Sequence, residues 1–157
     1  MIPEVFFVKY AFPCSFVLRQ QKKITQEDFV TLEDAALHQK VLNKVFLERV
    51  FVKAFERISV LAEEMNKNKW DLDVLREYFL VRHNEIIEGG QSTYANTPPV
   101  LNELCMVHKA KVIGKKDSVL IVEYGFGKKR PVNNDLVPNA KVGNTVTIHY
   151  GYAVEIV

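Results

Sequence analysis

A cysteine and two histidines in the last third of the chain are the residues whose types could bind a metal. Cys105 and His108 have the Cys-x-x-His spacing of a metal-ligand pair, and His149 follows some forty residues later. Thiolate and imidazole are ligands for transition metals. One such pair is half of a zinc site, and the sequence holds no second pair. We therefore consider Cys105 as a single soft ligand, His149 as a supporting or possible second ligand, and His108 as a third candidate.

Strand parity separates these candidates. In the alternating segment 145–150, His149 takes a polar position, so we expect its ring on the solvent-facing side of a strand. Cys105 shares its parity with two lysines, which also favours the polar face. His108 shares its parity with apolar residues, which favours a structural histidine over a ligand. A free cysteine is often a small buried hydrophobe, and that alternative stays open for Cys105.

The elements that must position these residues change character near residue 100. Beyond it, apolar and polar residues alternate in short runs separated by turn residues, which is typical of strands. Five strands in about fifty residues predict a small, partly open β-barrel of the oligonucleotide-binding type. The expected strands lie near 105–113, 118–124, 128–133, 145–150 and 153–157.

The first part of the chain has helical periodicity instead. Helices are expected near 4–10 and 14–22, from Thr25 onwards, from Leu42 to Met65, and from Leu72 to Glu88 with a stop at Gly89-Gly90. Together they predict a small bundle, so the fold class is α+β with the two kinds of element segregated. The stretch 91–104 has a linker composition. We therefore expect a helical domain at 1–90, a linker at 91–104 and a barrel domain at 105–157.

Composition places the chain among ordinary globular proteins. Hydrophobic residues make up 48% of the 157 residues, and no apolar run reaches transmembrane length. The chain has two cysteines, Cys14 and Cys105, and its apolar start lacks the features of a secretory signal, so we expect reduced thiols in the cytoplasm. Cys14, flanked by apolar residues, is most simply explained by core packing.

Four segments of the last fifty residues resemble the HypC/HupF hydrogenase assembly chaperones. They are Cys105-Met106-Val107, the Gly-rich basic hairpin 122–130, Asp135-Leu136-Val137-Pro138, and the closing segment 142–153 with Val-Gly-Asn-x-Val-x-Ile-His-x-Gly-x-Ala. The sequence departs from the family in two ways. The cysteine is internal instead of N-terminal, and the proline four residues after it is replaced by Lys109.

The resemblance implies a scaffold and not an enzyme. It implies that iron carrying cyanide and carbon monoxide is held together with a HypD-like iron–sulfur protein. The iron fragment is then delivered to the precursor of a nickel–iron hydrogenase large subunit. Cys105 matches the iron-binding cysteine of the family, and His149 matches the histidine of its closing motif. The helical region 1–104 would then be a recognition or docking domain.

A basic hairpin supplies the remaining predicted site. Residues 105–157 hold eight Lys and Arg against four Asp and Glu, an excess too small to indicate nucleic acid. We assign partner binding to Lys128, Lys129, Arg130, Tyr150 and Tyr152, and expect no membrane association. The alternative function is an adaptor that has kept the barrel, has lost the iron chemistry, and uses the hairpin to bind protein or RNA.

Overall fold

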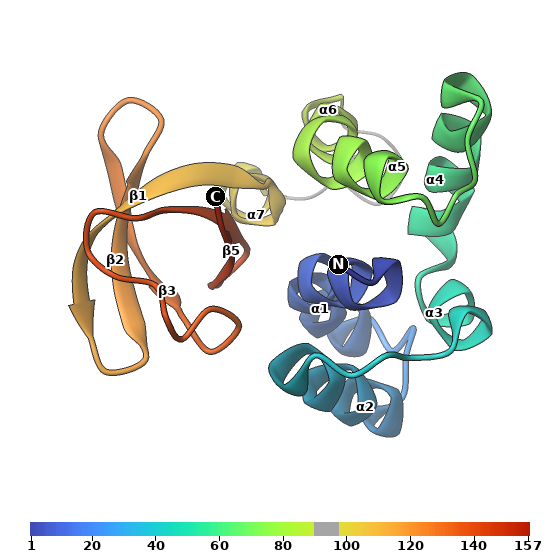
Figure 1. Ribbon diagram of the computed structural model, residues 1–157, viewed down its shortest axis with the longest axis horizontal. Helices are drawn as coiled ribbons and strands as arrows, with labels where there is room; N and C mark the ends of the chain where they lie inside the picture. Colours follow the sequence, from blue (N-terminus) through green and yellow to red (C-terminus); the bar gives the residue numbers. More distant parts are fainter. Residues whose placement is uncertain (90–97) are drawn as a thin grey trace. The chain divides into compact units, whose positions relative to one another are not determined.

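A computed structural model describes residues 1–89 and 98–157 and shows helices followed by a β-barrel (Figure 1). The contacts divide it into two compact units, Met1–Arg82 and His83–Val157. The predicted fold class, segregated α+β with a five-stranded barrel, is confirmed. The predicted division at 1–90, 91–104 and 105–157 stays a prediction, because half of the expected linker lies outside the described residues.

The helices of the first unit pack around aromatic side chains. They are α1 (Pro3–Gln20), α2 (Gln26–His38), α3 (Lys44–Val50), α4 (Val52–Met65), α5 (Leu72–Glu77) and the π-helical turn η1 (Tyr78–Arg82). Buried Phe7 contacts the rings of Phe51, Phe55, Trp70 and Phe79. Such a cluster buries a large apolar area, which is the main source of stability here.

Three helix boundaries differ from those predicted. One helix, α1, replaces the two expected near 4–10 and 14–22; Pro13 lies inside it and is buried, as are Phe12 and Ser15 on either side. The run 42–65 breaks at Phe51, whose φ and ψ of −105° and 50° are not helical. The run 72–88 is helical throughout but contains η1, and a π-turn shifts the phase expected from a period of 3.6 residues.

The predicted helix start at Thr25 and the predicted helix ends at Met65 and Glu88 are confirmed. Thr25 caps α2 as expected: its side chain accepts from the Asp28 N–H at 3.0 Å, and the Asp28 carboxylate accepts from the Thr25 N–H at 3.3 Å. This capping box satisfies two backbone donors that helix geometry leaves without partners. Asp71 occupies the N-cap position of α5 but makes no side-chain cap hydrogen bond. The expected stop at Gly89-Gly90 is confirmed at Gly89, because the helix ends at Glu88 and Gly89 is in a turn; Gly90 lies outside the described residues.

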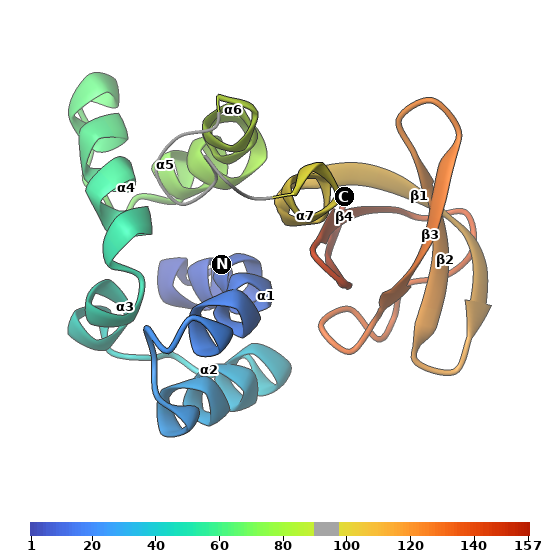
Figure 2. The same cartoon turned by 180° about the vertical axis from the view of Figure 1, so that it is seen from behind.

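The second unit is a closed barrel with two short helices. The helices are α6 (His83–Glu88) and α7 (Pro99–Cys105), and the strands are β1 (His108–Lys116), β2 (Val119–Tyr124), β3 (Lys128–Asn133), β4 (Thr145–His149) and β5 (Tyr152–Ile156). Neighbouring strands follow the order β1-β2-β3-β5-β4, and β4 closes on β1 (Figures 1 and 2). Residues 99–104, expected in the linker, and Cys105, expected to begin the first strand, form α7, and Pro99 occupies its first turn, where proline is tolerated.

Inward-facing residues fill the barrel. The core consists of small and branched apolar side chains, with Tyr124 near one end. The register places Arg130 opposite Val122 and Lys128 opposite Tyr124, so these two cations lie on the inward face of β3. Side chains on one face of a strand alternate with those on the other, and Lys129 therefore points outward.

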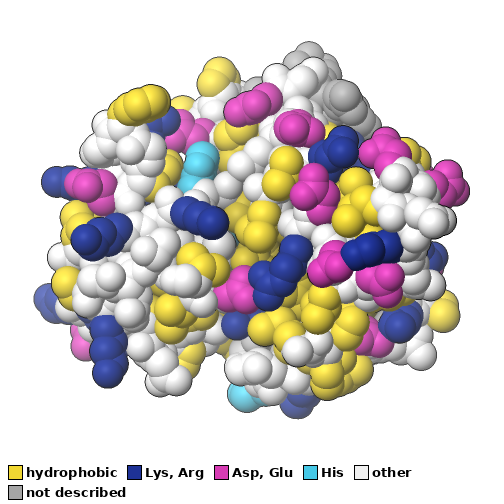
Figure 3. Space-filling model, turned by 45° about the horizontal axis from the view of Figure 1, so that its top comes forward, with side chains coloured by type: hydrophobic (Ala, Val, Ile, Leu, Met, Phe, Trp, Pro, Cys, Tyr) yellow, Lys and Arg dark blue, Asp and Glu magenta, His cyan; other side chains and the backbone are white. Residues whose placement is uncertain are grey.

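The charged side chains are mixed in sign. Lys and Arg lie among Asp and Glu over the face that Figure 3 shows. None of the described helices combines the length and apolarity needed to cross a bilayer.

Candidate functional site

Cys105 is the last residue of α7 and is buried, with 4% of its surface exposed. The prediction that it begins a strand and faces solvent is wrong. The strand β1 starts only at His108, so parity counted back from its lysines does not reach Cys105. Burial raises the pKa of the Cys105 thiol to about 11. The sulfur is therefore stored as a neutral thiol at physiological pH.

Three hydrogen bonds hold the segment around Cys105 in place. The Tyr150 N–H donates to the Leu104 carbonyl at 2.7 Å. The Asn84 side chain of α6 donates to the Val107 carbonyl and accepts from the Val107 N–H, each at 2.8 Å. Because Leu104 and Val107 flank Cys105, these bonds hold the cysteine against the barrel near the β4–β5 turn.

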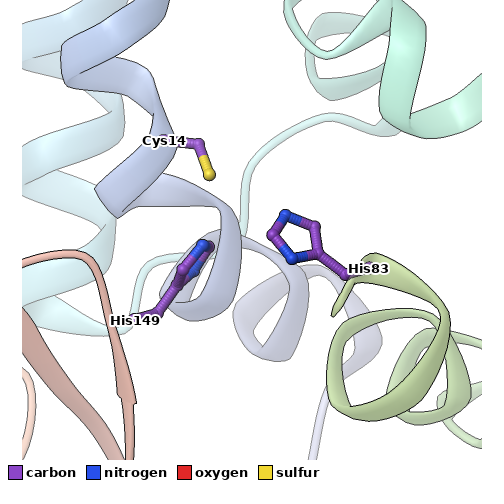
Figure 4. Close-up of side chains that lie close together, drawn as sticks. All are labelled: Cys14, His83 and His149. Carbon is purple, nitrogen blue, oxygen red and sulfur yellow. The ribbon is translucent and has the colours of Figure 1, made fainter. Parts of the chain in front are cut away.

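His149 lies at the end of β4 and is fully buried, so its predicted exposure is also wrong. The ladder between β4 and β5 is irregular at Thr147–Ile148, which breaks simple alternation. The ring of His83 covers His149 from α6, at 5.1 Å between ring centroids and with planes 81° apart (Figure 4). His83 is likewise buried. Cys14, also labelled in Figure 4, belongs to α1 of the first unit.

His108 opens β1 on the inward face of the barrel, opposite Ile148 of β4. Its ring lies 4.8 Å from that of Tyr124, and its Nε2 atom has no hydrogen-bond partner among the described residues. Desolvation lowers the pKa of His108, and a hydrogen bond with the backbone of Glu103 opposes that shift. A half-buried neutral ring at the barrel mouth is the state that this environment favours.

The basic hairpin is not a tip of three solvated charges. Lys128 pairs with Glu103 of α7 at 2.7 Å, and exposed Lys129 lies 3.7 Å from Glu123. Arg130 lies over the ring of Tyr124, 5.1 Å from its centroid, and desolvation lowers the pKa of its guanidinium.

The tyrosines assigned to partner binding flank the turn between β4 and β5. Tyr150 has a φ of 53°, a left-handed conformation that few non-glycine residues adopt, and Tyr152 begins β5. Both side chains are half-buried. A partner that contacted this turn would reach the same end of the barrel as Leu104 and Cys105, through the Tyr150–Leu104 hydrogen bond.

The sequence analysis missed Glu103, which joins α7 to the barrel. Its carboxylate accepts from Lys128 Nζ at 2.7 Å and from the Tyr124 hydroxyl at 3.2 Å. The hydrogen bond from Lys128 is the main reason why the pKa of Glu103 is lowered. No sequence signal identified this residue, because its partners are more than twenty positions away. A cavity of about 360 Å³ opens beside it, lined by Ile87, Glu88, Pro99, Asn102, Glu103, Met106, His108 and Lys128.

These features define a small closed β-barrel led by a helix, with a buried cysteine before the first strand and a histidine before the closing hairpin. Within that class, residues 104–157 match the HupF/HypC family, which confirms the resemblance over that part of the chain. The match supports a general role as a chaperone in hydrogenase maturation. A comparison with curated proteins found no match to the chain.

Proposed function

We propose that the protein is a HypC-type scaffold for hydrogenase maturation in the cytoplasm. It holds an iron fragment carrying cyanide and carbon monoxide through Cys105, together with a HypD-like iron–sulfur protein. It then delivers the fragment to the precursor of a nickel–iron hydrogenase large subunit. The observation that carries this proposal is the family match over residues 104–157, which spans both Cys105 and His149.

The chemistry of a single thiolate supports the role of a carrier. A soft sulfur ligand suits low-spin iron, and a fragment held by few protein ligands is easily released. Groups of three or more candidate ligand atoms do not form around Cys105 among the described residues. The other ligands of the iron would then come from the fragment itself and from the partner protein.

Loading requires that Cys105 leave its buried position. The thiol must lose its proton to become a ligand, and desolvation now opposes that loss. The helix α7 has only seven residues, and helices this short have little intrinsic stability. Displacement of α7 by the partner would expose the sulfur to water and cargo together. In this proposal His149 supports the site after α7 has moved, and His108 lines it.

Partner recognition is assigned to two parts of the chain. Exposed Lys129, together with Tyr150 and Tyr152 at the closing turn, would contact the HypD-like protein. The helical unit Met1–Arg82, which the family match does not reach, would select the client or partner.

A second candidate function is an adaptor without iron chemistry. Two observations favour it: the buried, protonated state of Cys105, and the fully exposed Phe126 at the tip of the β2–β3 hairpin. An exposed aromatic side chain on a barrel hairpin is suited to stacking against a partner.

The test is an anaerobic pulldown of the intact protein with its cellular partners. Bound iron is read by infrared absorption where metal-bound cyanide and carbon monoxide absorb. We expect bands that disappear in Cys105→Ala and remain in Cys14→Ser, which removes the other thiol. A partner that copurifies without such bands, and does so equally with Cys105→Ala, would refute the carrier and leave the adaptor. Loss of that partner in Phe126→Ala would then identify the hairpin tip as its contact.

A further inference from the structure

At the mouth of the barrel, one edge of the Arg130 guanidinium has N–H donors without acceptors among the described residues. Arg130 projects inward from β3, yet its Nε and Nη2 atoms are buried and have no hydrogen-bond partner among the described residues. These two nitrogens form one side of the planar guanidinium. Their parallel N–H groups match the two oxygens of a carboxylate in a bidentate pair. Buried donors are rarely left without an acceptor, so this edge indicates a missing ligand.

The surroundings of Arg130 fit an anion of single charge. Tyr124 covers one face of the guanidinium, and neighbouring Lys128 adds a second cation. One internal carboxylate is already present: Glu103 accepts from Lys128 and from the Tyr124 hydroxyl. A second carboxylate, Glu88, also lines the cavity beside Lys128, so a ligand of single charge meets less repulsion there than a doubly charged phosphate would. The adjoining cavity of about 360 Å³ reaches Lys128 and His108, whose Nε2 also lacks a partner among the described residues.

The geometry points to a carboxylate-binding site at the barrel mouth, in which the Nε–Nη2 edge of Arg130 holds a carboxylate, and Lys128, on the same face of β3, lines the cavity beside Glu103 and His108. The carboxylate belongs to a free organic acid or to an acidic side chain of a bound polypeptide. Glu103 marks the entrance. Its bond to Lys128 is partly exposed, and exposed ion pairs are weak, so the side chain yields readily to an incoming anion.

The site deepens the partner binding assigned above but does not depend on iron. Its test needs neither the maturation proteins nor the cargo, so its failure and the failure of the proposed function are distinguishable. It also changes the role of the hairpin. Lys129 faces outward and offers only a surface charge, whereas Arg130 offers a directed pair of donors inside the mouth.

The experiment titrates the full-length protein and follows the Arg130 Nε–H resonance by NMR, with affinities from calorimetry. The probes are sodium succinate for a free acid, and the capped peptide acetyl-Gly-Asp-Gly-amide with its Asn counterpart for a side chain. We expect saturable binding of succinate or of the Asp peptide, and none of the Asn peptide. Binding of succinate assigns a free acid, and binding of the Asp peptide alone assigns a polypeptide.

Matched variants test the geometry. Arg130→Gln should weaken binding roughly tenfold or more, because a bidentate charged pair is lost. Arg130→Lys should lose most of that affinity as well, since an ammonium keeps the charge without the fork. Lys111→Gln removes the same charge from an exposed position on β1, outside the hairpin, and should change affinity less than about twofold. Circular dichroism checks that each variant is folded.

Three results would overturn the site. The first is the absence of a saturable shift at Arg130 with both carboxylate probes in the unmodified protein. The second is an equal loss of affinity in Lys111→Gln and Arg130→Gln, which would show attraction by net charge only. The third is binding of inorganic phosphate as tight as that of the carboxylates at matched ionic strength. If Arg130→Gln does not fold, the titration of the unmodified protein and the Arg130→Lys variant still decide.

Discussion

At the scale of single residues, Cys105 is a thiol kept in its unreactive form. Nucleophilic attack and metal binding both need the thiolate, and burial at the end of α7 disfavours that charge. A carrier protein with such a thiol is protected from oxidation until its helix is displaced. The burial of Cys105 leads to two predictions that can be measured on the isolated protein.

Alkylation of Cys105 should be slow. In a Cys14→Ser background, which leaves one thiol, we expect iodoacetamide at pH 8 to react roughly a hundredfold more slowly with native protein than with protein in urea. The reason is that a pKa of about 11 leaves far less thiolate than the ordinary value of 9.0. Mass spectrometry follows the reaction. Equal rates in native buffer and in urea would show that the thiol is exposed.

The same shift makes stability depend on pH. The pKa of Cys105 is higher in the folded state than in the unfolded state, so the native state binds more protons at alkaline pH. The stabilisation of the native state that comes from the buried neutral thiol is fully present below pH 9. It is lost as the pH rises from 9.0 to about 11. The free energy of unfolding should therefore fall more steeply in this window for unmodified protein than for Cys105→Ala. Parallel urea titrations of the two proteins measure it, and identical slopes would contradict the burial of the thiol.

At the scale of elements, α7 is the helix that ends with Cys105, and its hydrogen bonds hold it against the barrel. Its contacts are short-range and few: Glu103 to Lys128 and Tyr124, and the Leu104 carbonyl to Tyr150. Such a helix can detach while the strands keep their own ladder. Exposure of the cysteine is then a local opening and not global unfolding.

Loss of the Glu103 contact should loosen this helix. We expect Glu103→Gln to speed alkylation of Cys105 a few-fold, because the charged bond to Lys128 is replaced by a weaker neutral one. The matched control is Glu123→Gln, which removes the other hairpin ion pair, with Lys129, on the outward face. That control should leave the rate unchanged. A rate that rises equally in both variants would assign the effect to overall charge and not to α7.

At the scale of the whole molecule, the two units have separate interiors. The barrel is filled by small and branched apolar residues, whereas the helical unit is filled by aromatic rings. The family match extends over residues 104–157 and does not reach the helical unit. The match therefore gives no indication of the function of that unit. Separate cores predict separate unfolding transitions.

A core substitution in the barrel should spare the helical unit. Leu120 is fully buried in the barrel, and Leu120→Ala should lower the free energy of unfolding of that unit by about 2–5 kcal/mol. Trp70, the single tryptophan, is buried in the helical unit and reports on it by fluorescence. We expect its urea midpoint to stay in place while hydrogen exchange in the strands accelerates. Leu47→Ala, in α3, should do the reverse. A common shift of both signals would indicate a single cooperative unit.

The sequence by itself determined the barrel, the start of α2, and the family of the last third. Alternation in 118–124 and 128–133, the Thr25 cap and the closing motif are local patterns, and local patterns survive in the folded chain. Only the tertiary structure decided what covers each face. Periodicity shows which residues share a side of a strand, but His149 is buried because α6 lies over it, and Cys105 because a helix precedes β1. Arg130 turns inward because its register with Val122 places it there, and a register between strands is a property of the fold.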